Sequence, residues 1–303
     1  MLVCSRAPVR IDFAGGWTDV SLFAASAGGA VVSATIDKYV HGRMSVIDAD
    51  EVSVSAAGSE GISVSYHSDL PAGSGLGTSA TLNVVWLSLV KRQVTSDADR
   101  IRIAELSYDL ERILGILGGK QDQYSSALGG FNYFTFSETV KVERLTPSPE
   151  LIAELEDRLV LCYTGKPRLS SNIHQEVWNN YRAGNPATVN ALYSLRAVAE
   201  NMRAVLLAGD VTAFGTLLNE NWQHQKALHS SITNPQIDSL FEFARSHGGV
   251  AGKACGAGGG GCLLFLAAPG EAAHLAQELQ AQQVRVIPFH FDFEGLQVQI
   301  EKE

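Results

Sequence analysis

The spacing of apolar residues in the first half of the chain predicts a mixture of short strands and helices. Runs rich in β-branched and aromatic residues indicate strands, and apolar positions three and four apart indicate helices. The expected strands are residues 9–13, 30–36, 40–47 and 62–66, and the expected helices are residues 79–91 and 100–114. This half of the chain therefore reads as α+β.

The second half is mainly helical and follows a polar stretch broken by prolines, LTPSPE (residues 145–150). The expected helices are residues 172–182, 188–208, 211–227 and 237–247, and the expected strands are residues 262–266 and 284–289. We place a boundary near residue 150, which gives a first domain of residues 1–150 and a second domain of residues 151–303. No repeat or low-complexity linker separates the two, so we expect them to pack closely.

Composition is that of a globular protein. The chain has 303 residues, of which 46% are hydrophobic and 18% are charged. No apolar run approaches the roughly 20 residues of a membrane helix, so we expect a cytoplasmic protein with no membrane partner. A net charge of −9 argues against nucleic acid, because binding to a phosphate backbone needs clustered Lys and Arg. A small phosphorylated ligand is compatible with this charge, and a homodimer remains open.

The four cysteines indicate neither a disulfide framework nor a zinc site. Cys4, Cys162, Cys255 and Cys262 form no CxxC pair, and only the last two lie near each other in the sequence. We expect them to be small buried apolar residues in a reducing compartment.

The stretch PAGSGLGTSA (residues 71–80) is a candidate anion site. Gly73, Gly75 and Gly77 permit positive φ and expose main-chain N–H groups, and Thr78 and Ser79 begin a helical pattern. Unpaired N–H groups and the positive end of a helix dipole attract phosphate. A tight turn would have a similar composition, so the loop alone does not decide between the two.

A second glycine run, GKACGAGGGGCLLFL (residues 252–266), contains a GxGxxG match at Gly256, Gly258 and Gly261. A dinucleotide fold needs a helix after that match, and here an apolar, strand-like segment follows. A P-loop is excluded as well, because alanine follows Lys253 where Ser or Thr would hold magnesium. So many glycines indicate close approach of a ligand or of another loop.

The stretch RAPVRIDFAGGWTDV (residues 6–20) combines a cation, an aromatic ring and a carboxylate. Arg10 lies in an expected strand, and Trp17 and Asp19 follow a Gly-Gly turn. A carboxylate accepts hydrogen bonds from sugar hydroxyls and a ring packs on the sugar's C–H face, so this grouping suits a sugar. Asp19 as a turn residue and Trp17 as a core residue are equally compatible with the local sequence.

The fourth stretch, LERILGILGGKQDQYSSALGG (residues 110–130), places Glu111 near the end of a helical pattern and Asp122 after a Gly-Gly break. An aspartate among polar neighbours after a glycine turn is a candidate general base. A helix cap is the alternative.

In chain order, RAPVRIDFAGGWTDV resembles the first motif of the GHMP kinase family, PAGSGLGTSA its second motif, which is the phosphate loop, and GKACGAGGGG its third. The family includes galactokinase, homoserine kinase and mevalonate kinase. The resemblance implies a two-domain α+β fold, with an N-terminal domain similar to the second domain of ribosomal protein S5, a ferredoxin-like C-terminal domain, and ATP in the cleft between them. The ATP-binding residues that it implies are Pro71, Gly73, Ser74, Gly75, Leu76, Gly77, Thr78, Ser79, Gly258 and Gly259.

The resemblance also implies catalytic roles. In the family, a Glu eleven residues before the catalytic Asp and the last Ser of the phosphate loop hold Mg²⁺, and Glu111, Asp122 and Ser79 match these positions. Asp122 would then take the proton from the acceptor hydroxyl, and Arg10 would offset charge at the reacting centre. Lys120 either assists or is a solvated loop residue.

The substrate implied by the resemblance is a sugar, because Asp19 is retained in the first motif. Galactose is disfavoured, since GGWTD stands here where galactokinase has GEHTD. Trp17 is similar to the fucokinase branch, whereas GGKQDQYSSALGGFN (residues 118–132) and GKACGAGGGG are similar to the branch acting on D-glycero-D-manno-heptose 7-phosphate, which we prefer. For the distal phosphate of that substrate, Lys166 and Arg168 are the candidates.

Two rival classes stay open. One is a non-kinase with the same fold, either a decarboxylase acting on a diphosphate or a sensor of sugar and ATP. Intact Ser79, Glu111 and Asp122 argue against a sensor, which has no need of a general base. The other is a dinucleotide-dependent oxidoreductase that would use the second glycine run.

Overall fold

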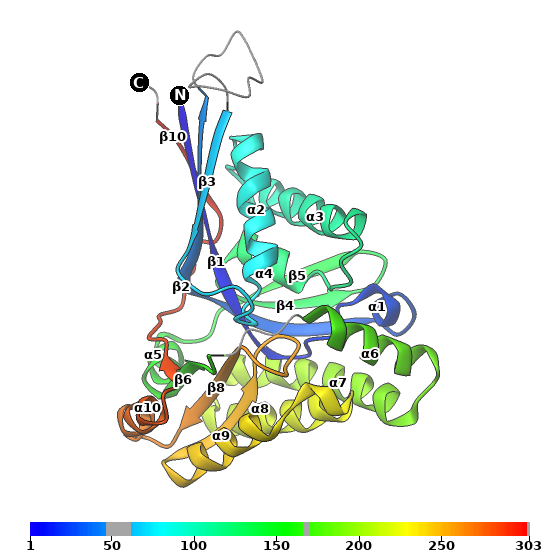
Figure 1. Cartoon of the computed structure of the whole chain (residues 1–303), viewed down its shortest axis with the longest axis vertical. Coiled ribbons are helices and arrows are strands. Elements are labelled where there is room, and N and C mark those ends of the chain that lie inside the picture. Colours follow the sequence, from blue (N-terminus) through cyan, green and yellow to red (C-terminus); the bar gives the residue numbers. More distant parts are fainter. Residues whose placement is uncertain (47–61, 166–169, 302–303) are drawn as a thin grey trace.

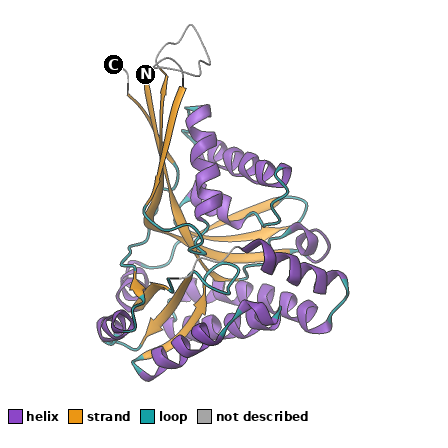
Figure 2. Ribbon diagram, in the orientation of Figure 1, coloured by secondary structure: helices purple, strands orange, loops and turns teal. Residues whose placement is uncertain are grey.

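The computed structural model describes residues 1–46, 62–165 and 170–301, and the strands in these ranges form two antiparallel sheets (Figures 1 and 2). The strands of the first sheet are β1 (Leu2–Ala14), β2 (Gly29–Val46), β3 (Ile62–Ser68), β4 (Phe131–Phe136), β5 (Val140–Leu145) and β10 (Gln297–Glu301). The strands of the second sheet are β6 (Leu159–Tyr163), β7 (Gly249–Ala254), β8 (Cys262–Ala267) and β9 (Arg285–Val286).

The first sheet has the order β10-β1-β2-β4-β5, and β3 pairs with the outer part of β2. The strands expected at residues 30–36 and 40–47 are two arms of the single strand β2. Between them, two extra residues interrupt the register, because Pro8 pairs with Tyr39 while Val9 pairs with Ile36. The division at residue 150 stays a prediction. Strand β10 belongs to residues 151–303, the second domain of that division, and it joins the first sheet beside β1.

Helices α2 (Thr78–Lys91) and α4 (Gln121–Leu128) pack on one face of the first sheet, and α3 (Asp97–Ile113) packs against these two helices. The short α1 (Ser21–Ala27) follows the turn after β1. The helix expected at residues 79–91 is confirmed, and only one side of it is buried. Val85 and Leu89 are buried, whereas Leu82 and Trp86 are exposed.

The remaining helices follow the polar stretch near residue 150. They are α5 (Pro149–Arg158), α6 (Ser170–Arg182), α7 (Pro186–Ala208), α8 (Val211–Ala227), α9 (Pro235–Ser246) and α10 (Ala272–Ala281), with a 3-10 turn η1 (Ser230–Ile232). Helices α5, α7 and α9 each begin at a proline, preceded by the capping side chains of Ser148, Asn185 and Asn234. Proline suits this position because its missing N–H would be unpaired there in any case.

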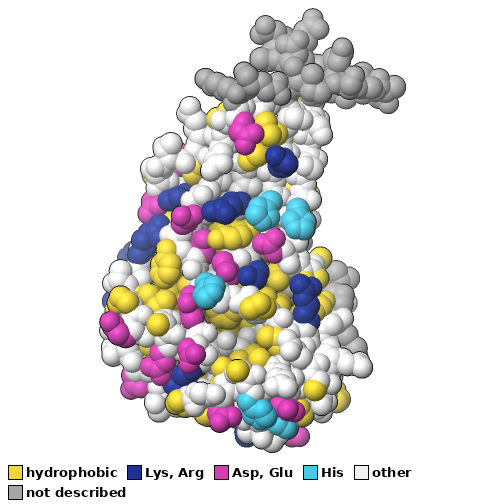
Figure 3. Space-filling model, turned by 90° about the vertical axis from the view of Figure 1, so that its left-hand side faces the viewer, with side chains coloured by type: hydrophobic (Ala, Val, Ile, Leu, Met, Phe, Trp, Pro, Cys, Tyr) yellow, Lys and Arg dark blue, Asp and Glu magenta, His cyan; other side chains and the backbone are white. Residues whose placement is uncertain are grey.

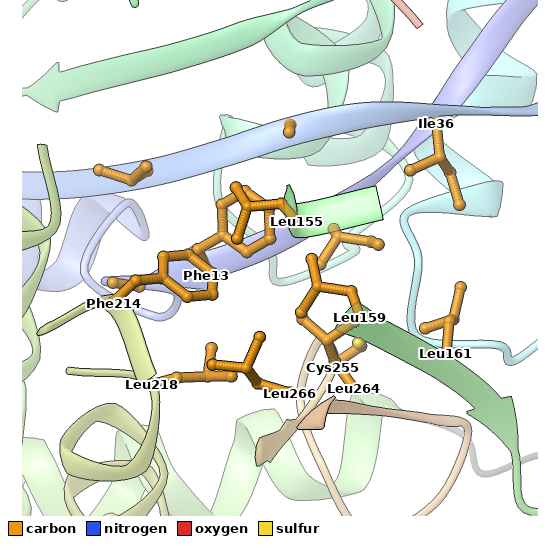
Figure 4. Close-up of a cluster of buried hydrophobic side chains, with 14 of the residues drawn as sticks. Phe13, Ile36, Leu155, Leu159, Leu161, Phe214, Leu218, Cys255, Leu264 and Leu266 are labelled. Atoms are coloured by element: carbon orange, nitrogen blue, oxygen red, sulfur yellow. The ribbon is translucent and has the colours of Figure 1, made fainter. Parts of the chain in front are cut away.

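One hydrophobic core joins the two sheets (Figure 4). Phe13 and Ile36 enter it from the first sheet, Leu161 and Leu264 from the second, and Phe214 from α8. Phe13 packs edge-on against Phe214, with ring centroids 5.2 Å apart. The two sheets are therefore packed closely, as the lack of a linker predicted.

The expectations for one strand and for the cysteines have plain outcomes. The strand expected at residues 284–289 is confirmed only at β9. Cys162, Cys255 and Cys262 are buried free thiols, and Cys4 is half-buried. In the ranges that the structure describes, no helix is long and apolar enough to cross a membrane. On the face shown in Figure 3, basic side chains are interspersed with acidic ones.

Candidate active site

The four sequence stretches meet at one cavity of about 390 Å³. Its walls come from β1 and the turn after it, the loop before α2, the segment from the end of α3 to the start of α4, the loop between β7 and β8, and α6. An antiparallel bridge between Val20 and Gly119 holds the turn after β1 against the segment before α4. Residues far apart in the sequence therefore line a single cavity.

The loop before α2 has the geometry of an anion site. Gly73, Gly75 and Gly77 have φ of 75°, 79° and 76°, which place their N–H groups along the turn without steric cost. Gly77 is the N-cap residue of α2, and no side chain of the described residues caps this helix. The first N–H groups of a 14-residue helix are thus left for a ligand, beside the positive end of its dipole.

Asp122 lies in the first turn of α4, directly against this loop. A Cβ at Gly77 would be 3.2 Å from Asp122 Oδ2, so glycine lets the carboxylate approach the backbone. Arg10 on β1 donates to Asp122 Oδ1 from Nε, at 2.8 Å, and its Nη2 lies 2.7 Å from the same oxygen. Its Nη1 donates to the carbonyl of Gly75 at 2.9 Å. Arg10 thereby ties Asp122 to the loop.

The Arg10 side chain is 3% exposed. Burial alone would lower the pKa of Arg10, but the carboxylates of Asp122 and Asp12 raise it above its ordinary value. The cation is therefore permanent, and it sits between two carboxylates.

Glu111, at the end of α3, is oriented by two amides. Asn83 Nδ2 donates to its Oε1 at 3.0 Å and Gln123 Nε2 to its Oε2 at 2.7 Å. Burial, followed by the nearby charge of Asp122, raises the pKa of Glu111 to about 7, although the two amides act in the opposite direction. Ser79 lies exposed in the first turn of α2 and lines the same cavity.

Asp19 is a second buried carboxylate in the cavity, 4% exposed. Its Oδ2 accepts from the Gln121 N–H at 3.0 Å and its Oδ1 from Gln121 Nε2 at 3.4 Å. Burial is the main cause that raises the pKa of Asp19 to about 7, with a smaller contribution from Asp122. A Cβ at Gly119 would lie 1.9 Å from Asp19 Oδ2, so this glycine is required by close approach.

Trp17 and His174 form an aromatic wall of the cavity. Their rings stack with centroids 4.3 Å apart. Trp17 has a φ of 80°, a conformation that is costly for a bulky residue and that clusters at active sites and ligand-binding sites. Burial lowers the pKa of His174 to about 4, so its ring is neutral at physiological pH. Trp17 is thus both buried in the core and part of the cavity, so the two interpretations of it are compatible.

Four buried polar atoms of the cavity lining have no hydrogen-bond partner within the described part of the chain. They are Trp17 Nε1, His174 Nδ1, Gln121 Oε1 and Gln123 Oε1. Unpaired buried polar atoms are rare in folded proteins and call for an explanation. Sequence reasoning had noted the two glutamines only as neighbours of Asp122, and it missed His174, since nothing in the local pattern of α6 distinguishes it.

Some predicted ATP-binding residues do not line the cavity. Leu76 is fully buried, and Pro71 and Gly259 lie outside the lining. The Gly259 N–H donates instead to the carbonyl of Ile232. The second glycine run leads into β8, a strand, so the dinucleotide fingerprint lacks the helix that it needs.

Three other basic residues were candidates for the site: Lys166, Arg168 and Lys120. Lys166 and Arg168 lie outside the described residues. Lys120 makes an ion pair with Glu105 on α3, at 2.7 Å, and its Nζ lies over the ring of Tyr108.

Comparison with known proteins gives the family. The model of the GHMP kinases N terminal domain matches residues 44–130, and that of the GHMP kinases C terminal domain matches residues 200–285. The chain belongs to the GHMP kinase family. The two-domain fold predicted from the resemblance is therefore confirmed, and the chain is an ATP-dependent phosphotransferase with an alcohol group as acceptor.

Three relatives illustrate the similarity. The chain is 29% identical to a D-glycero-alpha-D-manno-heptose 7-phosphate kinase of Campylobacter jejuni, over 96% of this chain and 97% of that protein. It is 27% identical to a bifunctional fucokinase/GDP-fucose pyrophosphorylase of Arabidopsis thaliana, over 90% of this chain and 30% of that longer protein. The crystal structure of a D-glycero-D-manno-heptose 1-phosphate kinase from Bacteroides thetaiotaomicron superposes with a TM-score of 0.77 at 26% identity, covering 99% of this chain and all of that one.

Proposed function

We propose that the protein transfers the γ-phosphoryl group of ATP to the anomeric hydroxyl of a sugar or sugar phosphate. The observation that carries the proposal is the placement of Asp122 between an uncapped helix N-terminus and the buried carboxylate of Asp19. The helix N-terminus suits phosphate, and the Asp19 carboxylate suits an acceptor rich in hydroxyl groups. Asp122 lies where the two would meet.

In the proposed mechanism, Asp122 is the general base. Nε and Nη2 of Arg10 both lie against its Oδ1, which leaves Oδ2, near Gly77, for the proton of the acceptor hydroxyl. Arg10 also supplies a fixed positive charge beside the reacting oxygens. Because phosphoryl transfer depends mainly on positioning and charge stabilisation, such a rigid arrangement favours the reaction.

Mg²⁺ is proposed to bind at Ser79 and Glu111. A hydroxyl and a carboxylate are the hard oxygen ligands that Mg²⁺ prefers, and the ion usually takes its other ligands from phosphates and water. The raised pKa of Glu111 marks a buried carboxylate that lacks a cation partner within the described residues. When bound, Mg²⁺ would neutralise charge on the β- and γ-phosphates.

The acceptor is proposed to lie against Trp17 and His174, with hydroxyls on Asp19 and Gln121. The rings offer a flat apolar surface to the C–H face of a sugar, and the neutral His174 ring has one donor and one acceptor nitrogen. The unpaired atoms of Trp17, His174 and Gln121 offer further hydrogen bonds to hydroxyl groups after small side-chain adjustments.

Among sugars, we favour D-glycero-D-manno-heptose 7-phosphate, which would give the 1,7-bisphosphate. The support is the C. jejuni relative, which matches along nearly the whole of both chains. A fucokinase-like activity on a free sugar is the second candidate, supported by the fucokinase relatives and by Trp17 in the first motif. Lys166 and Arg168 remain the proposed residues for the distal phosphate.

A panel of acceptors tests the proposal. ADP release with Mg·ATP is measured for D-glycero-D-manno-heptose 7-phosphate, mannose, L-fucose and galactose, and without sugar. Turnover on the heptose phosphate alone supports the first candidate, and turnover on L-fucose supports the second. ADP release that no sugar increases would refute the proposed function.

A further inference from the structure

A buried ion pair lies behind the cavity. Lys253 Nζ on β7 lies 2.6 Å from Asp12 Oδ2 on β1 and donates to the Asp12 carbonyl, also at 2.6 Å. The two side chains are 0% and 2% exposed, and they join the two sheets. Apolar residues of the same size often stabilise a protein as well as a buried ion pair does, because both charges must be desolvated. A contribution to stability is therefore a weak explanation for the presence of this ion pair.

Asp12 also holds the second glycine loop. Its Oδ1 accepts from the Gly256 N–H at 3.2 Å. Gly256 in turn packs on the loop before α2, since a Cβ at Gly256 would be 2.6 Å from the carbonyl oxygen of Gly75. A Cβ at Gly75 would be 2.8 Å from the carbonyl oxygen of Cys255. The two glycine loops thus touch backbone to backbone, and Asp12 fixes one side of that contact.

Arg10 fixes the other side. It precedes Asp12 by two residues on β1, so both side chains leave the strand on the same side. Its Nη1 donates to the carbonyl of Gly75, and its other nitrogens hold Asp122. Charges therefore alternate from β7 to α4, in the order Lys253, Asp12, Arg10 and Asp122.

We propose that Lys253 and Asp12 are positioning residues for phosphoryl transfer, whose ion pair holds the second glycine loop against the phosphate loop. The inference rests on the proposed function, because it takes the loop before α2 as the phosphate site. Without Lys253, Asp12 keeps Arg10 as its neighbouring cation and competes with Asp122 for it. Without Asp12, the Gly256 N–H loses its acceptor and the back of the phosphate loop is released.

The double variant Asp12→Leu/Lys253→Met separates positioning from stability, since it replaces the pair by apolar side chains of similar size. Urea unfolding reports stability, and calorimetric titration with Mg·ADP reports the phosphate site without any sugar. We expect stability near that of the wild type, with Mg·ADP affinity lowered by about 10-fold or more and kcat by up to about 10²-fold. Wild-type affinity and wild-type kcat in this folded variant would overturn the proposal.

Two single variants complete the test. Lys253→Arg keeps the charge and should recover part of the lost affinity. Arg158→Met is the matched control, because Arg158 is a largely buried cation whose Nε donates to Ala267 at the far end of β8. It should lower stability and leave Mg·ADP affinity unchanged. An equal loss of affinity in this control would mean that any buried cation in the second sheet has the same effect, which would also overturn the proposal.

A failure of the proposed function gives a different result. If the wild type turned over no sugar, the acceptor would be wrong, but the Mg·ADP titrations would still show whether the ion pair supports the phosphate site.

Discussion

Replacing Asp19 with asparagine should stabilise the ligand-free protein, and the gain should grow with pH. The pKa of Asp19 is raised from 3.8 to about 7, chiefly by burial. The folded protein therefore keeps a proton that the unfolded chain releases. The stability that this proton contributes is complete below about pH 4 and is lost as the pH rises through 7. The asparagine side chain has no charge to bury, and its oxygen can still accept from the Gln121 N–H.

The size of the stabilisation follows from the pH range between the two pKa values of Asp19, 3.8 in the unfolded chain and about 7 in the folded protein. Each pH unit between the two pKa values changes the free energy of unfolding by about 1.4 kcal/mol. From pH 5 to pH 8 the advantage of the variant should therefore increase by about 3 kcal/mol, almost all of it below pH 7. Urea unfolding of both proteins at pH 5, 7 and 8 measures it, and carboxyl groups that do not interact with Asp19 cancel in the difference. An advantage that does not change with pH would refute the reasoning.

The other predictions concern catalysis. Asp122→Asn should lower kcat by about 10²- to 10⁴-fold with Mg·ADP affinity unchanged; near-normal turnover would exclude the general base. Gly119→Ala should raise the sugar KM, because its Cβ would displace Asp19, while Gly118→Ala, whose Cβ would meet no atom closer than 4.0 Å, should have a smaller effect. His174→Ala should raise the sugar KM and leave the ATP KM unchanged, and equal changes in both would contradict an acceptor contact. Glu111→Gln should raise the Mg²⁺ concentration for half-maximal rate by about 10- to 100-fold in a titration at saturating ATP, and an unchanged requirement would exclude it as a ligand.

Much of the site could be predicted because its chemistry is local in the sequence. Positive φ at Gly73, Gly75 and Gly77 follows from residue type, and so does the helix start at Thr78. The structure adds the reason for Gly77, which is the carboxylate of Asp122 lying against it. Spacing alone could not show that contact, since it depends on how α4 packs.

Contacts between distant segments were not predictable from a single sequence. The pairing of Lys253 with Asp12 spans the two sheets, and His174 reaches the cavity only because α6 packs beside the turn after β1. Strand β10 was missed for the same reason, since its partner β1 lies at the other end of the chain. The proline at residue 149, interpreted as part of a boundary, is the first residue of α5.

The site of phosphorylation in the product tests the central claim most directly. The protein is incubated with Mg·ATP and the best acceptor of the panel, and a phosphorus–proton correlation NMR spectrum of the product is recorded, with Asp122→Asn as the control. We expect the new phosphorus signal to correlate with the anomeric proton of the sugar, and to be nearly absent with the variant. A correlation with any other sugar proton, or release of inorganic phosphate in place of a sugar phosphate, would contradict the proposed function.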